Sequence, residues 1–287
     1  MDNNTKTTLP GDIDVQVRAA LSEDLGNGDL TAGLVPEGQR AHATIVSREA
    51  AVICGQAWVT EVFRQVDPAI SPDWQVSEGE SVASDTLLCR LQGPARGLLT
   101  AERTALNFLQ TLSGTATATR RYVEAVAGTG AIVLDTRKTL PGLRLAQKYA
   151  VNCGGGRNHR IGLFDAILIK ENHIAAAGSI SAAAATARAY RVLVEIEVEG
   201  LHQMPEALAT GADRLLLDNF SLDQLRAAVQ LRNEEAPGVP LEASGGITLA
   251  NIRSIAETGV DFISVGAITK DLSAIDLSMR FEFQEQR

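Results

Sequence analysis

The feature that most constrains the fold is a repeated alternation of apolar runs and helix-like segments between residues 131 and 268. Each apolar run is rich in β-branched residues and ends in polar residues or glycine. The six runs occupy 131–138, 165–172, 192–199, 213–219, 239–246 and 261–267. Because strands that alternate with helices form parallel sheets with right-handed crossovers, this part of the chain predicts an open (β/α) barrel of about six to seven strands.

Helix boundaries within this repeat carry their own signals. Ser221 and Thr248 stand where helix N-caps are expected, and Gly211 and Gly259 stand where helices are expected to stop. The segments between the apolar runs are therefore interpreted as the helices of the barrel.

The first 112 residues follow a different pattern. A helix is expected near 12–25, followed by short strands and a second helix at 56–67. We predict an α/β protein of two domains. Residues 1–112 form an N-terminal α+β, sandwich-like domain, residues 113–269 form the barrel, and the tail 270–287 packs back on the first domain.

Composition excludes several classes of function. The net charge is -9, from 26 basic and 35 acidic residues, which argues against nucleic acid or an anionic membrane as a partner. No apolar segment approaches the roughly 20 residues needed to span a bilayer, and the polar N-terminal dozen lacks the apolar core of a signal peptide. Cys54, Cys89 and Cys153 show neither metal-ligand spacing nor a disulfide framework. We expect a cytoplasmic protein.

Polar residues follow each of the six apolar runs. In a barrel of this kind the functional groups lie at the carboxyl ends of the strands. The strand-end residues are Arg137-Lys138, Lys170-Glu171-Asn172-His173, Glu199, Asp218-Asn219, Ser244-Gly245-Gly246 and Gly266. A single such ending would mean little, but six of them predict an active site at one edge of the sheet.

The run 192–199 places three carboxylates on one face. Glu195, Glu197 and Glu199 alternate with apolar residues, so they are expected to point into the barrel. Buried carboxylates need cations, and we expect Lys138 and Lys170 to supply them. The alternative is an edge strand whose glutamates face solvent.

Cations are concentrated between the first two runs. Within 137–173 there are seven of them, Arg137, Lys138, Arg144, Lys148, Arg157, Arg160 and Lys170, with His159 and His173 besides. Such a region suits a small polyanion, although Arg144 and Lys148 taken alone also fit a solvated helix.

Turns ending in ASGG and SVGA suit phosphate, since backbone N–H groups can bind it and glycine allows its close approach. Glu199 and Asp218 between them can hold Mg²⁺ or stabilise a developing positive charge. This combination favours transfer of a phosphorylated sugar onto an acidic acceptor.

Eight motifs resemble one known family. They are EDLGNGDLT (23–31), ERTALNFLQTLSGTAT (102–117), DTRKTLPGLR (135–144), KYAVNCGGGRNHRIGLFDAILIKENHI (148–174), EIEVEG (195–200), LLLDN (215–219), EASGGI (242–247) and ISVGAIT (263–269). Their sequences and order resemble quinolinate phosphoribosyltransferase. The resemblance implies an α/β N-terminal domain before an open barrel, and a homodimer or larger assembly. The implied reaction converts quinolinate and phosphoribosyl pyrophosphate into nicotinate mononucleotide, pyrophosphate and CO₂ with Mg²⁺, in NAD biosynthesis.

The resemblance also implies roles for individual residues. Arg137, His159 and Arg160 would bind the two quinolinate carboxylates, with Lys138 and Lys170 in the same pocket. Arg103 would reach this pocket from the other chain of a dimer. Glu199 and Asp218 would engage the ribose hydroxyls and Mg²⁺ and, with Lys138 and Lys170, act in catalysis. The 5′-phosphate would be held by Ser244, Gly245, Gly246 and Gly266.

Three alternatives stay open at this point. One is a Schiff-base aldolase with Lys170 as its amine. Another is a homologue that uses a different pyridine or base as acceptor. The third is a ligand-binding sensor without catalysis, for which the full set Arg137, Lys138, Lys170, Glu199 and Asp218 would be unnecessary.

Overall fold

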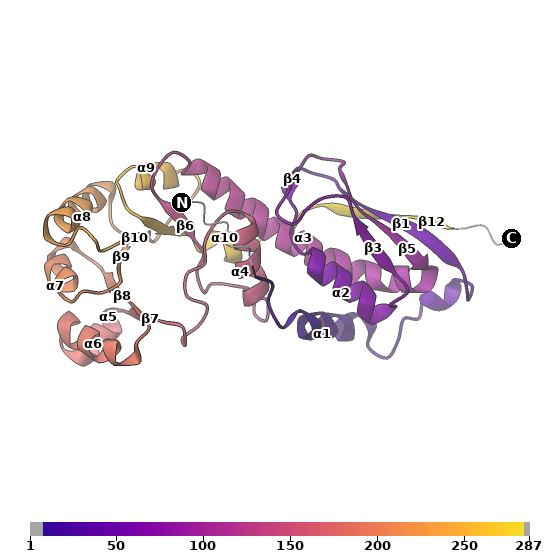
Figure 1. Ribbon diagram of the computed structural model, residues 1–287, viewed down its shortest axis with the longest axis horizontal. Coiled ribbons are helices and arrows are strands. Elements are labelled where there is room, and N and C mark those ends of the chain that lie inside the picture. The colour runs from indigo at the N-terminus through magenta and orange to yellow at the C-terminus, as the bar shows by residue number, and fades with distance from the viewer. Residues whose placement is uncertain (1–7, 284–287) are drawn as a thin grey trace. The chain divides into compact units, whose positions relative to one another are not determined.

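The computed structural model describes residues 8–283, which divide into two compact units (Figure 1). Within these residues the first unit comprises 8–118, Leu140–Gly155 and 272–283. The second unit comprises Thr119–Thr139 and Gly156–Asp271. The chain therefore leaves the second unit after Thr139 and returns to it at Gly156.

The first unit is built on a four-stranded antiparallel sheet in the order β12-β1-β5-β3. Its strands are β1 (Arg40–Ser47), β3 (Ser71–Trp74), β5 (Leu87–Pro94) and β12 (Leu277–Phe283), and a second small sheet pairs β2 (Ala51–Val52) with β4 (Ser81–Val82). Its helices are α1 (Ile13–Leu25), η1 (Ala32–Leu34), α2 (Gln56–Val66), most of α3 (Ala95–Ala125) and α4 (Arg144–Cys153).

The alternation of side chains explains how this sheet builds a core. Along β1, Ala41 and Ile45 are buried whereas Arg40 is exposed, as the two-residue period of a strand requires. Trp58 of α2 is fully buried, and its ring centroid lies 5.5 Å from that of Tyr149 in α4. The apolar faces of α2 and α4 therefore share one core with the inner face of the sheet.

The second unit holds a parallel six-stranded sheet in the order β6-β11-β10-β9-β8-β7. Its strands are β6 (Ile132–Leu134), β7 (Ala166–Ile169), β8 (Leu193–Val198), β9 (Arg214–Asp218), β10 (Leu241–Ser244) and β11 (Phe262–Ser264). Every neighbouring pair is parallel, with β6 and β7 at the two edges. The six strands correspond to the six apolar runs, so the predicted α/β architecture with an open barrel is confirmed.

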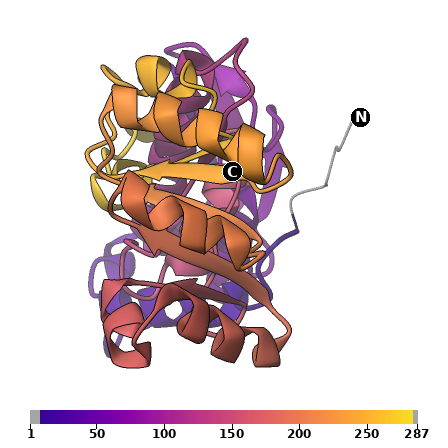
Figure 2. The ribbon, with the colours of Figure 1, turned by 90° about the vertical axis from the view of Figure 1, so that its left-hand side faces the viewer.

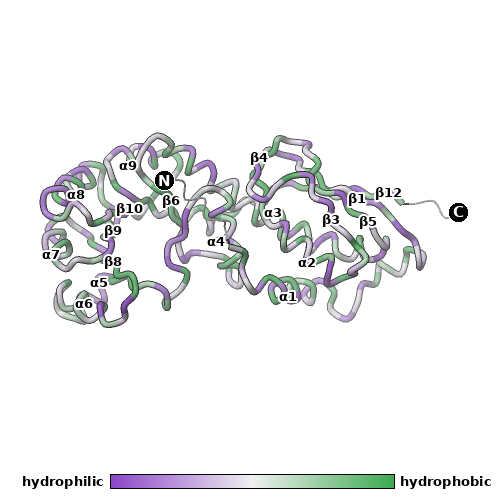
Figure 3. Tube along the Cα trace, in the orientation of Figure 1, coloured by the Kyte–Doolittle hydropathy of each residue, from purple (hydrophilic) through white to green (hydrophobic). Residues whose placement is uncertain are grey.

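Helices cover the outer side of this sheet. They are α5 (Glu171–Ala177), α6 (Ile180–Ala187), η2 (Arg188–Tyr190), η3 (Leu201–Gln203), α7 (Met204–Ala209), α8 (Leu222–Glu235), α9 (Ile252–Ala256) and α10 (Ala267–Lys270). Figures 1 and 2 show α6, α7 and α8 side by side along the outside of the strands. In Figure 3 hydrophobic and hydrophilic stretches alternate along α8, as expected of a helix with one face on a sheet.

The predicted N-caps have different outcomes. Ser221 caps α8, because its hydroxyl accepts from Gln224 N–H while the Gln224 side chain accepts from Ser221 N–H. Thr248 does not cap α9. That helix begins after Asn251, whose Oδ1 accepts from Thr248 N–H, so a turn separates the strand end from the helix.

Several statements about domain boundaries and chain termini remain predictions. The proposed boundaries at 112 and 269 remain predictions, although β12 of the C-terminal tail pairs with β1 over seven residue pairs. Residues 1–7 and 284–287, which belong to the predicted polar N-terminus and the tail, lie outside the described residues. None of the described helices combines the length and the apolar character that a membrane span requires.

Candidate active site

The polar strand ends of the second unit lie at one edge of its sheet, because all six strands run in the same direction. Arg137 and Lys138 follow β6, Glu199 follows β8 and Gly266 follows β11. Asp218 and Ser244 are the last residues of β9 and β10, and Lys170 is the N-cap of α5 directly after β7. His159 and Arg160 lie in the loop before β7. Arg103 is an exposed residue of α3 in the first unit.

Asp135 anchors the loop that carries His159 and Arg160. Its fully buried carboxylate accepts from Asn158 Nδ2 at 2.7 Å and from His159 N–H at 2.8 Å. The backbone N–H of Asp135 donates to the carbonyl of Arg157 at 3.1 Å. The DTRK and NHR segments, separated in the sequence, are therefore joined through one carboxylate.

The guanidinium groups of Arg137 and Arg160 are near enough to interact electrostatically. Burial, and then the positive charge of nearby Arg137, lower the pKa of Arg160, while Glu195 and Asp165 act in the opposite direction. Arg160 Nη1 also donates to the carbonyl of Ala166 at 3.3 Å. Like charges repel unless an anion or a carboxylate compensates them. This pair is therefore suited to an anionic ligand.

Lys170 pairs with an inward glutamate, as predicted. Its Nζ lies 2.6 Å from Glu197 Oε2, and the Glu197 side chain is only 8% exposed. Since β8 lies between β7 and β9, the alternative of a solvated edge strand is wrong for Glu195 and Glu197. Glu199, just beyond the strand, is exposed, and its N–H donates to Gln203 Oε1 at 2.7 Å.

The predicted pairing of Lys138 with the glutamates is wrong. No carboxylate of the described residues lies within ion-pair distance of its Nζ, because three strands separate β6 from β8. The Lys138 stem instead lies beside Gly266, where a Cβ atom would approach Lys138 Cδ to 3.2 Å. Thr269 Oγ1 donates to the Lys138 carbonyl at 2.7 Å. Lys138 thus lies at the glycine turn after β11.

The interior of the sheet holds a second charged group, the Glu195 cluster, which comprises His159, Glu195, Arg214 and Glu242. Arg214 Nη1 lies 2.6 Å from Glu242 Oε2, and Arg214 Nε lies 3.8 Å from Glu195 Oε1. His159 Nε2 lies 2.8 Å from Glu195 Oε2 and 3.6 Å from Glu242 Oε1. Burial, and then the charge of Glu195, raise the pKa of Glu242 to about 7. Burial also raises the pKa of Glu195, which Arg214 partly offsets.

Asp218 is connected to the glycine turn after β10 through Asn219. The Asn219 side chain donates to Asp218 Oδ2 at 2.8 Å, and its backbone N–H donates to the carbonyl of Ser244 at 2.9 Å. Asn219 adopts a left-handed conformation with φ 57°. Gly245 and Gly246 also have positive φ, 97° and 60°, which favours glycine at these positions.

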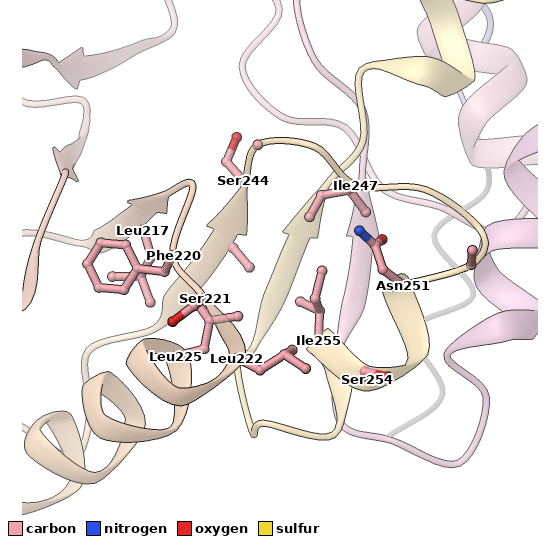
Figure 4. Close-up of a pocket in the computed structure, with 13 residues that line it drawn as sticks. Leu217, Phe220, Ser221, Leu222, Leu225, Ser244, Ile247, Asn251, Ser254 and Ile255 are labelled. Atoms are coloured by element: carbon pink, nitrogen blue, oxygen red, sulfur yellow. The ribbon is translucent and has the colours of Figure 1, made fainter.

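A hollow of about 290 Å³ lies behind this turn, between α8 and α9 (Figure 4). Its lining is mostly apolar and includes Leu222, Leu225 and Ile255, with Ser244 at its rim. The charged site residues do not line it. We therefore interpret it as a gap in helix packing beside the glycine turn after β10, and not as the substrate pocket.

Glu199 and Asp218 fit the requirements of a magnesium ion. They offer hard carboxylate oxygens from the ends of adjacent strands, and Mg²⁺ is usually held by one or two carboxylates together with substrate phosphates and water. Among the described residues, the groups of three or more metal-ligating side chains are Cys54, Glu78, Cys153 and His159, Glu195, Glu242. Neither of these groups includes Glu199 or Asp218, so the ion would need ligands from the substrate.

Two family models match adjoining parts of the chain. One, described as the C-terminal domain of quinolinate phosphoribosyl transferase, matches residues 115–280, and the other, its N-terminal domain, matches 29–113. The chain belongs to the quinolinate phosphoribosyltransferase family. The resemblance carried by DTRKTLPGLR and the other motifs is thereby confirmed, and the chain is a member of a family of phosphoribosyl-transferring enzymes.

Relatives and solved structures of the quinolinate phosphoribosyltransferase family match nearly the whole chain. The nicotinate-nucleotide pyrophosphorylase [carboxylating] of Mycobacterium leprae is 45% identical, over 92% of this chain and 95% of that protein. A probable enzyme of the same name from Synechocystis sp. is 42% identical, over 93% and 92%. The structure of the nicotinate-nucleotide pyrophosphorylase from Francisella tularensis aligns with a TM-score of 0.92 at 47% identity, covering 96% of this chain and 98% of that one.

Three residues of the site were not identified from the sequence: Asp135, Arg214 and Glu242. Asp135 adjoins the predicted site residues Arg137 and Lys138, so its motif could have indicated it. Arg214 and Glu242 are charged residues inside apolar runs, at the first and second positions of β9 and β10. A charged residue within an apolar run that is predicted to be a buried strand could have indicated both of them.

Proposed function

We propose that this chain transfers the phosphoribosyl group of phosphoribosyl pyrophosphate to quinolinate and releases nicotinate mononucleotide, pyrophosphate and CO₂, in NAD biosynthesis. The observation that carries the proposal is the arrangement of one sheet edge. A pair of guanidinium groups, Arg137 and Arg160, lies at the same edge as the glycine turns of Ser244–Gly246 and Gly266. An acceptor with two carboxylates and a donor with a 5′-phosphate can be bound there together.

The proposed roles follow the charges of the two substrates. Arg137 and Arg160 bind the quinolinate carboxylates, with His159 and Lys170 in the same pocket and Arg103 from a partner chain. Guanidinium groups match carboxylates in a bidentate manner. The backbone N–H groups of Ser244, Gly245, Gly246 and Gly266 bind the 5′-phosphate. Lys138, whose stem passes Gly266, adds a cation for the donor phosphates.

Catalysis in this proposal depends on positioning and electrostatics. The pyridine nitrogen attacks C1 of the ribose while the bond from C1 to the pyrophosphate oxygen breaks. Glu199 and Asp218 hold the ribose hydroxyls and stabilise positive charge at C1. The quaternary nitrogen then accepts electron density, so the bond from C2 to its carboxylate breaks, CO₂ leaves and C2 takes up a proton.

We also propose Mg²⁺, a homodimer and a cytoplasmic location. When bound, Mg²⁺ supplies positive charge for the pyrophosphate leaving group, and Glu199 and Asp218 are the residues suited to hold it. The exposure of Arg103 on α3 supports its donation to another chain. A net charge of -9, three cysteines that form no disulfide and the absence of a spanning helix among the described residues support a cytoplasmic location.

A Schiff-base aldolase is less well supported. Nζ of Lys170 is engaged by Glu197 at 2.6 Å, whereas a Schiff base requires a neutral, available amine. The test of the proposed function is an assay of pyrophosphate release with phosphoribosyl pyrophosphate and Mg²⁺. Release is expected with quinolinate and not with nicotinate as acceptor. Equal release with nicotinate would assign a different acceptor, and no release with either would contradict the proposal.

A further inference from the structure

Both ring nitrogens of His159 have a polar neighbour within the protein. Nδ1 accepts the backbone N–H of Arg160 at 2.7 Å. A backbone N–H can only donate, so Nδ1 carries a lone pair and the ring hydrogen must be on Nε2. Nε2 lies 2.8 Å from Glu195 Oε2, and the His159 side chain is 11% exposed. The imidazole therefore lies between a buried carboxylate and the backbone N–H of Arg160, from which it accepts a hydrogen bond.

The carboxylates at Nε2 are held by one internal cation. Arg214 contacts both Glu242 and Glu195, and its guanidinium stacks on the Phe262 ring at 4.3 Å from the centroid. Glu195 and Glu242 are 1% and 0% exposed. A buried carboxylate without a cation is costly, so Arg214 allows these two groups to remain inside the sheet.

The hydrogen bonding of these carboxylates is incomplete. Both oxygens of Glu195 and Oε1 of Glu242 have no hydrogen-bond partner of good geometry among the described residues. The short distance from His159 Nε2 to Glu195 is a close contact whose N–H direction departs from the ideal line. The Nε2–H group of His159 thus lies beside two carboxylates that can still accept a hydrogen bond. Their attraction for this N–H favours the observed orientation of the ring.

The backbone of His159 is also held by a hydrogen bond to Asp135. Asp135 accepts the His159 N–H, while the ring of His159 accepts the N–H of Arg160. Two consecutive N–H groups of this loop are therefore bonded to side chains. The direction in which the Arg160 side chain leaves the loop depends on both contacts.

We propose that Glu195, Glu242 and Arg214 are positioning residues of the quinolinate pocket, which orient the His159 ring and through it set the backbone of Arg160. This inference rests on the proposed function. It adds a role for His159, which sets the backbone of Arg160 as well as lying in the quinolinate pocket.

A metal centre at the same residues is a weaker interpretation. His159, Glu195 and Glu242 have ligand atoms within 4.8 Å of one another. A metal ion would need the lone pair of His159 Nε2, but that nitrogen carries the hydrogen. Arg214 also already supplies a positive charge to both carboxylates.

Kinetics of Glu195→Gln and Glu242→Gln test the positioning role, with Glu235→Gln as the control on the exposed end of α8. We expect the KM for quinolinate to rise at least about tenfold in both variants, while the KM for phosphoribosyl pyrophosphate changes less than about twofold. The control should match the wild type. Unchanged KM for quinolinate, or an equal rise in both KM values, would overturn the inference.

Two His159 variants separate positioning from direct binding. His159→Asn keeps a side-chain acceptor near Nδ1, whereas His159→Phe keeps a ring without an acceptor. We expect the KM for quinolinate to rise several-fold less in His159→Asn than in His159→Phe. Equal losses in the two variants would show that the Nδ1 contact with Arg160 has no role and would contradict the proposal.

The state of the imidazole can be measured without activity. The chain has four histidines, so ¹⁵N-histidine labelling gives few ring signals, and His159→Asn assigns the one of interest. We expect a neutral ring with the hydrogen on Nε2 at pH 7. A doubly protonated ring, or hydrogen on Nδ1, would overturn the inference even if quinolinate-dependent release is observed. If wild-type release fails while this tautomer is found, only the proposed function is contradicted.

Discussion

The side-chain carbonyl oxygen of Asn219 occupies the space that a Cβ atom on Gly245 would need. The backbone nitrogen of Asn219 also lies 3.0 Å from that position. Asn219 itself has a positive φ and bonds both Asp218 and Ser244. One residue thus connects the carboxylate proposed for the ribose with the turn proposed for the 5′-phosphate.

Gly245→Ala is therefore expected to distort the turn proposed for the 5′-phosphate. The new methyl group overlaps Asn219 at a φ of 97°, which costs about 1–3 kcal/mol of stability by strain and overpacking. We expect the KM for phosphoribosyl pyrophosphate to rise at least about tenfold. Gly238→Ala is the matched control, since nothing lies within 4 Å of its Cβ position. Equal thermal unfolding and equal kinetics of the two variants would contradict this account.

The strand ends were predictable because a parallel sheet brings its carboxyl ends to one edge. Once the six apolar runs were recognised, the neighbourhood of Asp218, Ser244 and Gly266 followed from topology alone. The pairing of Lys170 with a glutamate followed in the same way, since β7 and β8 are neighbours.

The pairing of Lys138 failed because strand order is not local information. Only one strand, β7, lies between β6 and β8 along the chain. In the sheet, however, β11, β10 and β9 separate them. The contact between Arg214 and Glu242 was missed for a related reason. Their alignment depends on the register of β9 with β10, which a single sequence does not reveal.

Glu199→Ala and Asp218→Ala test the charges proposed at the ribose. Each should lower kcat more than about tenfold, because stabilisation of positive charge at C1 is lost in the transition state. Both proteins should fold, since Glu199 is exposed and Asp218 is only partly buried. Circular dichroism and thermal unfolding check the fold, and Glu235→Ala is the control. Wild-type kcat in both variants would remove their assigned role.

The stability of the protein should depend on the proton of Glu242. Its folded pKa of about 7 lies above the ordinary value of 4.5. The folded state thus binds this proton more tightly than the unfolded state. The contribution of protonated Glu242 to the free energy of unfolding is fully present below about pH 4.5 and is lost as the pH rises through about 7. The loss is of the order of 3 kcal/mol.

Urea unfolding at several pH values measures this dependence. The difference in the free energy of unfolding between the wild type and Glu242→Gln isolates the titration of Glu242 and its neighbour Glu195, because the carboxylates outside the Glu195 cluster titrate alike in both proteins. We expect the wild type to lose stability relative to Glu242→Gln between about pH 5 and 8. A constant difference over that range would show that Glu242 does not carry the proton.

Mixed assemblies test whether Arg103 serves a neighbouring chain. Arg103→Ala chains and Lys138→Ala chains are each expected to be inactive alone. In a mixed dimer with Arg103 donated across the interface, one of the two sites contains both intact residues. Equal mixing should therefore restore about a quarter of the wild-type activity, since about half of the dimers are mixed. Two different affinity tags identify the mixed dimers. If purified mixed dimers stay inactive, Arg103 acts within its own chain or outside the active site.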